Sequence, residues 1–137
     1  MTEQRQWLIA GLGNPGRKYA RTRHNVGFEM VERLAAMMAI SLDASKFKAR
    51  FGRGFYRGIR VTLAETMNYM NRSGPPLSQL AAYFNIPITR TLVIHDDIEI
   101  AQGRIKIKAK GGHGGHNGLK SIIGAFGDSN FPRLRLG

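Results

Sequence analysis

The sequence contains no cysteine, so neither a disulfide framework nor a catalytic or metal-binding thiolate is available to it. It has no apolar stretch of membrane-spanning length, and its N-terminal apolar run is interrupted by glycine and asparagine, unlike the core of a signal peptide. No repeat, low-complexity segment or shift in composition marks a second domain. These absences predict one domain over residues 1–137, in a cytoplasmic protein with no membrane partner.

Acidic residues are scarce. Nine Asp and Glu stand against 21 Lys and Arg, which gives a formal net charge of +12. Long-range attraction at such a charge favours a phosphate-rich or otherwise acidic partner, and nucleic acid is the first interpretation. The alternative is a basic protein that is merely soluble.

Segments with strand-like and helix-like hydrophobic patterns alternate along the chain. Strands are expected at residues 7–10, 54–56, 59–64, 91–94 and 104–110, and helices at residues 28–38, 77–84 and 119–126. Arg57-Gly58 predicts a hairpin turn, and Ser73 is expected to cap the second helix. The pattern predicts an α/β fold, a single-domain mixed β-sheet flanked by helices on both faces.

The segment Gly11-Leu12-Gly13-Asn14-Pro15-Gly16 follows the first strand and fits the G-x-G-x-x-G pattern of dinucleotide-binding loops. That fingerprint also requires a helix that begins within the glycines and an acidic residue at the end of the next strand. Here Pro15 and residues 17–19 delay the helix, and Glu32 falls inside a helical pattern. A tight turn that needs glycines is the other interpretation, and it leaves Asn14 unexplained.

His24 precedes the first helix, and His95-Asp96-Asp97 stands at the end of a strand, where α/β sheets place their ligand clefts. A carboxylate at that place would orient the imidazole of His24 and leave its other nitrogen free to deprotonate water. The sequence has no serine in a nucleophile elbow, so water is the expected attacking group.

Lysines at alternate positions lead into a glycine loop that carries His113, His116 and Asn117. Alternate strand residues share one face, and glycine lets the backbone approach a ligand closely. A polyanion beside a reactive group is one interpretation of this stretch, and a solvated edge strand is the other. His113 and His116 with Asp96, Asp97 or Glu99 could also form a zinc site, although a glycine-rich loop would hold these ligands loosely.

Five motifs together resemble bacterial-type peptidyl-tRNA hydrolases in order and spacing across the whole chain. They are Gly11 to Gly16, Tyr19 with Thr22-Arg23-His24-Asn25, Tyr69-Met70-Asn71-Arg72-Ser73-Gly74, His95-Asp96-Asp97, and Gly114-Gly115-His116-Asn117-Gly118-Leu119. The resemblance implies an esterase that frees tRNA and peptide from peptidyl-tRNA with activated water, without metal or cofactor, as a monomer. A non-catalytic RNA-binding module or an inactive fragment of the same fold is the alternative.

The resemblance also implies roles for individual residues. His24 would activate water and Asp96 would pair with it, while the amides of Asn14, Asn71 and Asn117 would bind carbonyl groups or stabilise the oxyanion. The substrate side would include Tyr19, Met70, His116 and Asn117. The tRNA backbone and 3′ acceptor end would meet Lys106, Lys108, Lys110, Arg133 and Arg135.

Three departures from the family pattern stand out. Met67-Asn68 echoes Met70-Asn71, and the site role goes to Asn71 because Ser73-Gly74 follows at the family's spacing. Lys110 replaces a glycine found in many members. Members continue past the segment at Arg135 and add helical structure that covers the sheet, so the chain is expected to lack the C-terminal portion of the family.

Overall fold

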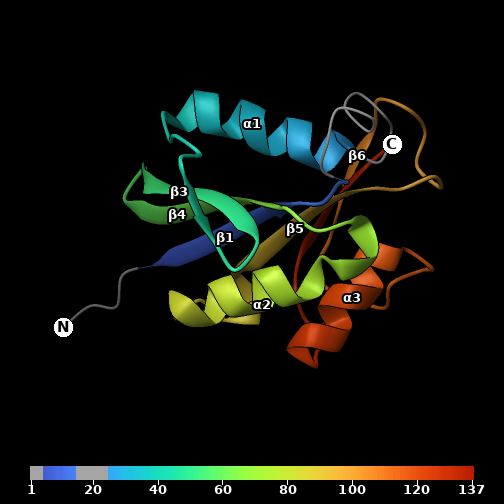
Figure 1. Cartoon of the computed structure of the whole chain (residues 1–137). Helices are drawn as coiled ribbons and strands as arrows, with labels where there is room; N and C mark the ends of the chain where they lie inside the picture. Colours follow the sequence, from blue (N-terminus) through green and yellow to red (C-terminus); the bar gives the residue numbers. More distant parts are fainter. Residues whose placement is uncertain (1–4, 15–24) are drawn as a thin grey trace.

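The computed structural model describes residues 5–14 and 25–137, which build one sheet between two layers of helices (Figure 1). The strands are β1 (Gln6–Gly11), β2 (Ala44–Lys46), β3 (Ala49–Tyr56), β4 (Ile59–Thr66), β5 (Thr91–Asp96), β6 (Ile105–Lys108) and β7 (Arg133–Leu136). The helices are α1 (Val26–Met38), α2 (Gly74–Tyr83) and α3 (Asn117–Phe126), with short 3₁₀ turns at Met70–Arg72 and Ile88–Arg90. Within the described ranges, no helix combines the length and the apolar character needed to cross a bilayer.

The sheet is mixed, as the sequence predicted. Its seven strands lie in the order β2-β3-β4-β1-β5-β7-β6. β1 runs parallel to β4 and β5, and β5 runs parallel to β7, whereas β2–β3, β3–β4 and β6–β7 are antiparallel pairs. Because β1, β5 and β7 run in the same direction, their carboxyl ends meet at one edge of the sheet, where ligand clefts of α/β folds form.

Helices cover both faces of the sheet, which confirms the predicted fold class (Figure 1). Period-two alternation divides the strands between two cores. In β1, Leu8 and Ala10 belong to the cluster beneath α2 and α3, while Ile9 packs in the cluster beneath α1. The burial of these apolar side chains on both faces is the main term that holds the helices to the sheet.

Two predicted strands have clearly different bounds in the structure, and one predicted helix cap does not form. The hairpin strands β3 and β4 extend well beyond residues 54–64, because Ala49 and Phe51 also pair with β4. The strand expected over 104–110 shrinks to β6, an exposed edge strand. Ser73 occupies the N-cap position of α2, but its hydroxyl donates to the carbonyl of Met70 at 2.7 Å instead of capping the helix.

The glycines after β1 serve close packing. A Cβ atom on Gly11 would clash with the carbonyl oxygen of Gly27, and one on Gly27 would lie 2.5 Å from the carbonyl oxygen of Leu12. The first turn of α1 therefore rests directly on the end of β1. The first described helix begins at Val26, and the part of the glycine motif after Asn14 lies outside the described residues.

Glu65 in β4 is a buried acid on the α1 side of the sheet. Its side chain is 7% exposed, and Arg50 lies 3.1 Å from its Oε1. Burial first, and then the neighbouring carboxyl group of Glu32, raise the pKa of Glu65 to about 8, against the opposing effect of Arg50. The folded state therefore holds a proton on Glu65 at pH values where the unfolded chain has lost it.

We expect this proton to make stability depend on pH. The favourable contribution of Glu65 to the free energy of unfolding is fully present below the pKa of the unfolded chain, about 4.3. It is lost as the pH rises through about 8, the pKa in the folded protein. Glu65→Gln should remove this loss and raise the free energy of unfolding at pH 8 by on the order of 2 kcal/mol relative to wild type. Urea unfolding at pH 5 and pH 8 measures the difference, and an equal pH dependence in both proteins would contradict it.

Candidate active site

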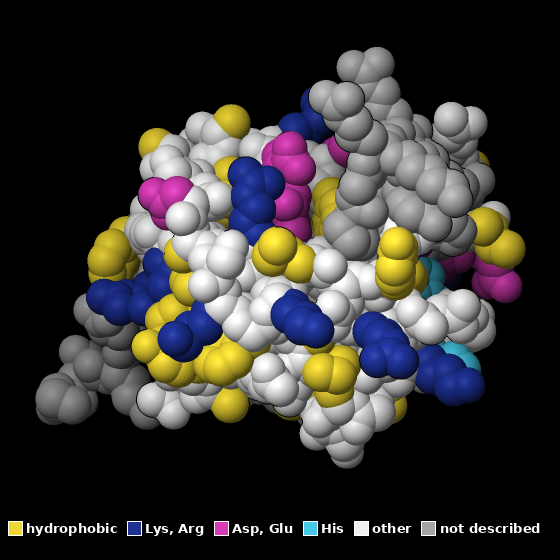
Figure 2. All heavy atoms as spheres, in the orientation of Figure 1, with side chains coloured by type: hydrophobic (Ala, Val, Ile, Leu, Met, Phe, Trp, Pro, Cys, Tyr) yellow, Lys and Arg dark blue, Asp and Glu magenta, His cyan; other side chains and the backbone are white. Residues whose placement is uncertain are grey.

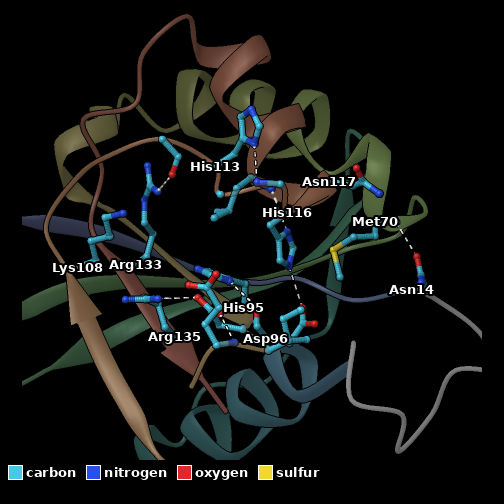
Figure 3. A pocket seen from close by; sticks show the side chains of 17 residues that line it. Asn14, Met70, His95, Asp96, Lys108, His113, His116, Asn117, Arg133 and Arg135 are labelled. Carbon is cyan, nitrogen blue, oxygen red and sulfur yellow. Dashed lines mark hydrogen bonds and ion pairs between the residues drawn. The ribbon is translucent and has the colours of Figure 1, made fainter. Parts of the chain in front are cut away.

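A cleft of about 440 Å³ opens at the carboxyl ends of the parallel strands (Figure 3). Its walls come from the end of β1, the 3₁₀ turn at Met70, the end of β5, the glycine loop before α3, and β6 and β7. Among the residues nominated from the sequence, it brings together Asn14, Met70, Asp96, Lys108, His116, Asn117, Arg133 and Arg135. The edge predicted to carry chemistry is therefore the edge where a cleft forms.

His116 connects α3 to β5. It is the N-cap residue of α3, and its Nδ1 accepts hydrogen bonds from the backbone N–H groups of Gly118 and Leu119, at 3.1 and 3.3 Å. A nitrogen that accepts N–H bonds carries no proton, so the ring proton resides on Nε2. Nε2 lies 2.8 Å from Oδ1 of the buried Asp96 and donates to it. The ring is thus held as a neutral donor by contacts on both sides.

The conformation of the glycine loop places His116 at the N-cap of α3. Gly114 and Gly115 adopt positive φ values of 55° and 84°, which side chains other than glycine rarely permit. A Cβ atom on Gly118 would lie 2.7 Å from the sulfur of Met70 and 2.8 Å from a methyl carbon of Leu12. Glycine at position 118 therefore lets the first turn of α3 pack against the wall of the cleft.

His95 and His113 adopt different hydrogen-bonding states. Nδ1 of His95 lies 2.7 Å from the carbonyl oxygen of Asp96 and donates to it, and the ring packs edge-on against His116 with centroids 4.9 Å apart. Burial lowers the pKa of His95 to about 4, so its ring is neutral at neutral pH. Nδ1 of His113 accepts the N–H of Gly115 at 2.9 Å, which places its proton on Nε2.

Asn14 gains a structural explanation that its turn alone could not give. Its Oδ1 accepts the backbone N–H of Met70 at 2.6 Å, and its own backbone is held by two bonds to the side chain of Asn25. The side-chain NH₂ group of Asn14 has no hydrogen-bond partner within the described part of the chain. A fixed amide donor therefore stands in the wall of the cleft beside Met70 (Figure 3).

The sequence assigned the site role to Met70-Asn71 and not to Met67-Asn68. The positions of the two methionines agree with this choice. Met70 is 8% exposed and lines the cleft, whereas Met67 is 50% exposed and lies outside it. Asn71 follows Met70 but is exposed and does not line the cleft. Its role as an amide donor stays a prediction, as do the roles of Tyr19 and His24, which lie outside the described residues.

Arg133 differs most from its predicted role as a tRNA contact. The residue is 1% exposed, and its guanidinium donates to the carbonyl groups of Gly111, Gly112, Ser129 and Phe131. Burial lowers the pKa of this guanidinium. With its donors committed to the backbone, Arg133 anchors the start of the glycine loop to β7. The sequence offered little signal for this, because one arginine in Arg133-Leu134-Arg135 looks like the other.

The remaining cations are arranged by strand register. Lys106 lies opposite Arg135, and Lys108 lies opposite Arg133, so these side chains share one face of the sheet. Arg135 pairs with Oδ2 of Asp97 at 2.9 Å. Burial alone would raise the pKa of Asp97, but the Glu99 N–H and Arg135 together lower it. Lys108 lines the cleft, whereas Lys106 and Lys110 are exposed and lie outside its lining.

The zinc alternative is not supported by these contacts. Both ring nitrogens of His116 are engaged, and Nδ1 of His113 is engaged as well. Across the described ranges, no three His, Asp or Glu side chains are grouped as metal ligands.

Two substitutions at His116 separate its two contacts. Asparagine is a favoured N-cap residue but is too short to bridge to Asp96, whereas alanine loses both contacts. We expect His116→Asn to lower the free energy of unfolding by about 1–3 kcal/mol and His116→Ala by about 1 kcal/mol more. Urea unfolding checks this, with His113→Ala as a control that stays near wild type; equal losses in both His116 variants would show that His116 does not cap α3.

Comparison with known proteins agrees with this geometry. The family model described as Peptidyl-tRNA hydrolase matches residues 8–137. The chain is 49% identical over 135 residues to the chloroplastic peptidyl-tRNA hydrolase of Arabidopsis thaliana, covering 98% of this chain and 47% of that protein. It is 45% identical over 131 residues to the peptidyl-tRNA hydrolase of Clostridium tetani, covering 96% of this chain and 70% of that protein.

Solved structures show the same fold. The crystal structure of peptidyl-tRNA hydrolase from Acinetobacter baumannii superposes with a TM-score of 0.92 at 42% identity, and the match covers 100% of this chain and 71% of that one. The chain spans about half the length of the plant relatives it matches, 47% and 53%, and about 70% of the bacterial ones.

Proposed function

The chain belongs to the peptidyl-tRNA hydrolase family, and on this premise we propose that it hydrolyses the ester between the peptide and the tRNA of peptidyl-tRNA. The observation that carries the proposal is the buried carboxylate of Asp96 in a cleft that also holds Asn14 and Asn117. A carboxylate that orients a base and amides that bind an oxyanion are the groups that ester hydrolysis by water requires. The proposed enzyme acts as a monomer, without metal or cofactor.

His24 is the proposed general base. The sequence contains four histidines, and the three described ones are poorly suited to the task. Burial makes His95 a weak base at neutral pH, and His113 and His116 use Nδ1 as an acceptor, which leaves the proton on Nε2. These contacts support His24, which is also the residue that the sequence motif nominates.

In the proposed reaction, His24 takes a proton from water as the water oxygen forms a bond to the ester carbonyl carbon. The NH₂ groups of Asn14 and Asn117 donate to the carbonyl oxygen as negative charge develops there, with Asn71 as a further candidate donor. The bond to the ribose oxygen then breaks, that oxygen receives the proton from His24, and the peptide leaves as a carboxylic acid that releases its proton to solvent. Met70 and Tyr19 form the apolar side of the peptide site.

Loss of the base should abolish turnover but not binding. His24→Ala should lower kcat on an N-acetylated aminoacyl-tRNA by at least about 100-fold, with an unchanged Kd for uncharged tRNA. His113→Ala is the matched control, because His113 is a histidine that lines the described cleft and its loss should keep most of the activity. Unchanged turnover in His24→Ala would refute the assignment, whereas tRNA binding by a wild-type chain that never releases peptide would select the alternative of a non-catalytic RNA-binding module.

The cations beside the cleft are proposed to hold the acceptor end of the tRNA. Lys106, Lys108 and Arg135 share one face of the sheet, and Lys110 follows at its exposed edge. Phosphate contacts of this kind position a substrate without reading its sequence. Arg133, on the same face, supports this surface by holding the carbonyl groups of Gly111 and Gly112 in the glycine loop.

Neutralising two of these lysines should weaken binding in a salt-dependent way. In Lys106→Gln/Lys108→Gln, the slope of log K against log salt should become shallower by about 1.4 to 1.8, because each lost phosphate contact removes about 0.7 to 0.9. Fluorescence anisotropy with uncharged tRNA at several salt concentrations measures the slope. A slope equal to that of wild type would place the tRNA elsewhere.

A further inference from the structure

A second basic surface lies far from the cleft, on the hairpin formed by β3 and β4. Residues 46–60 contain six Lys and Arg and four Phe and Tyr, and no acidic residue occurs between Asp43 and Glu65. Strand register places Lys46, Arg53 and Phe55 of β2 and β3 on the same face of the sheet as Arg60 of β4. This face is the one that α2 and α3 cover, and α2 ends there at Tyr83.

The cations and rings of this surface stack on one another. Arg60 lies over Phe55 at 4.9 Å, and Arg53 lies over Phe84 at 3.7 Å. Lys46 lies over Tyr83 at 4.8 Å. We call this group the hairpin surface, and its members are Lys46, Phe47, Arg53, Phe55, Arg60, Tyr83 and Phe84.

The hairpin surface carries positive charge that the described protein does not neutralise. Lys46, Arg53 and Arg60 have no carboxylate in ion-pairing range within the described residues. Nε of Arg60 is buried there without a hydrogen-bond acceptor. Partial burial, and then the charge of Arg60, lower the pKa of Arg53, which reflects cations held close together. An anionic partner would relieve this repulsion.

Two aromatic rings of the surface are open to a ligand. Phe55 is 54% exposed and Tyr83 is 55% exposed, although both are large apolar groups. Exposed rings interleaved with cations are what single-stranded RNA binds, because bases stack on the rings while phosphates meet the cations. An acidic peptide would use the cations but would have less use for the open rings.

The hairpin surface and the cations beside the cleft lie on the same face of the sheet, at opposite edges. β3 and β6 are five positions apart in the strand order. At the usual distance between neighbouring strands, this separates them by about 24 Å. Figure 2 shows Lys and Arg side chains among hydrophobic ones at the end where β3 and β4 lie, and further Lys and Arg side chains spaced across the face towards a histidine. One long polyanion could therefore contact both surfaces.

We propose that the hairpin surface binds unpaired nucleotides of the RNA substrate, at a distance from the ester in the cleft. The proposal rests on the proposed function, because the ester end of the same tRNA occupies the cleft. The hairpin surface adds affinity for the body of the tRNA and takes no part in the chemistry.

Two substrates separate this role from catalysis. One is an N-acetylated aminoacyl-tRNA of full length, and the other carries the same ester on a short 3′-terminal oligonucleotide. The test variants are Lys46→Gln/Arg60→Gln and Phe55→Ser/Tyr83→Ser. The matched control is Arg33→Gln/Met37→Ser, which removes an exposed cation and an exposed apolar side chain from α1 on the opposite face.

For full-length tRNA, KM should rise about tenfold in each test variant, the equivalent of losing one base stack or its phosphate contacts. For the short substrate, KM and kcat should match those of wild type, which also shows that the variants fold. Tyr83→Ser alone, at an exposed position, repeats the test if a double variant unfolds.

Equal KM values for test and control variants on full-length tRNA would overturn the proposal, and so would equal losses on both substrates. If wild type hydrolyses neither substrate, the proposed function fails by itself. The Kd for uncharged tRNA then decides the present inference: weaker binding in the test variants supports it, and unchanged binding overturns it.

Discussion

The architecture of the site depends on the imidazole of His116, which is bonded on both sides. Its Nδ1 caps α3, and its Nε2 holds the carboxylate of Asp96 at the end of β5. These bonds fix the helix, the strand and the wall of the cleft relative to one another. They also fix the proton, since a ring that accepts two backbone N–H bonds at Nδ1 has only Nε2–H to offer. His116, which the sequence placed on the substrate side, is therefore a positioning group.

The neighbouring elements serve the same constraint. Gly114 and Gly115 give the loop the positive φ values that bring His116 to the helix. Arg133 ties the beginning of this loop to β7 through buried bonds to carbonyl groups. The basic residues therefore have two roles. Arg133 stabilises the glycine loop, whereas the lysines of β6 remain exposed and can bind an anionic partner.

Hydrophobic periodicity was sufficient to predict the helices, the hairpin and the mixed sheet, because alternation in residues such as Leu8, Ile9 and Ala10 reports directly on two covered faces. The resemblance to peptidyl-tRNA hydrolases likewise implied a common site for Asn14, Met70, Asp96 and Asn117, which all line the cleft. It could not predict the bond between His116 and Asp96 or the burial of Arg133, since both depend on side-chain geometry across elements distant in sequence. Ser73 shows the local limit: its hydroxyl found a nearer acceptor in Met70.

The most direct test of this account is the protonation state of His116 at pH 7, measured from the ¹⁵N chemical shifts of its imidazole in the labelled chain. We expect a neutral ring with the proton on Nε2 and an unprotonated Nδ1. A ring protonated on Nδ1, alone or together with Nε2, would contradict it, because neither form could cap α3 with Nδ1.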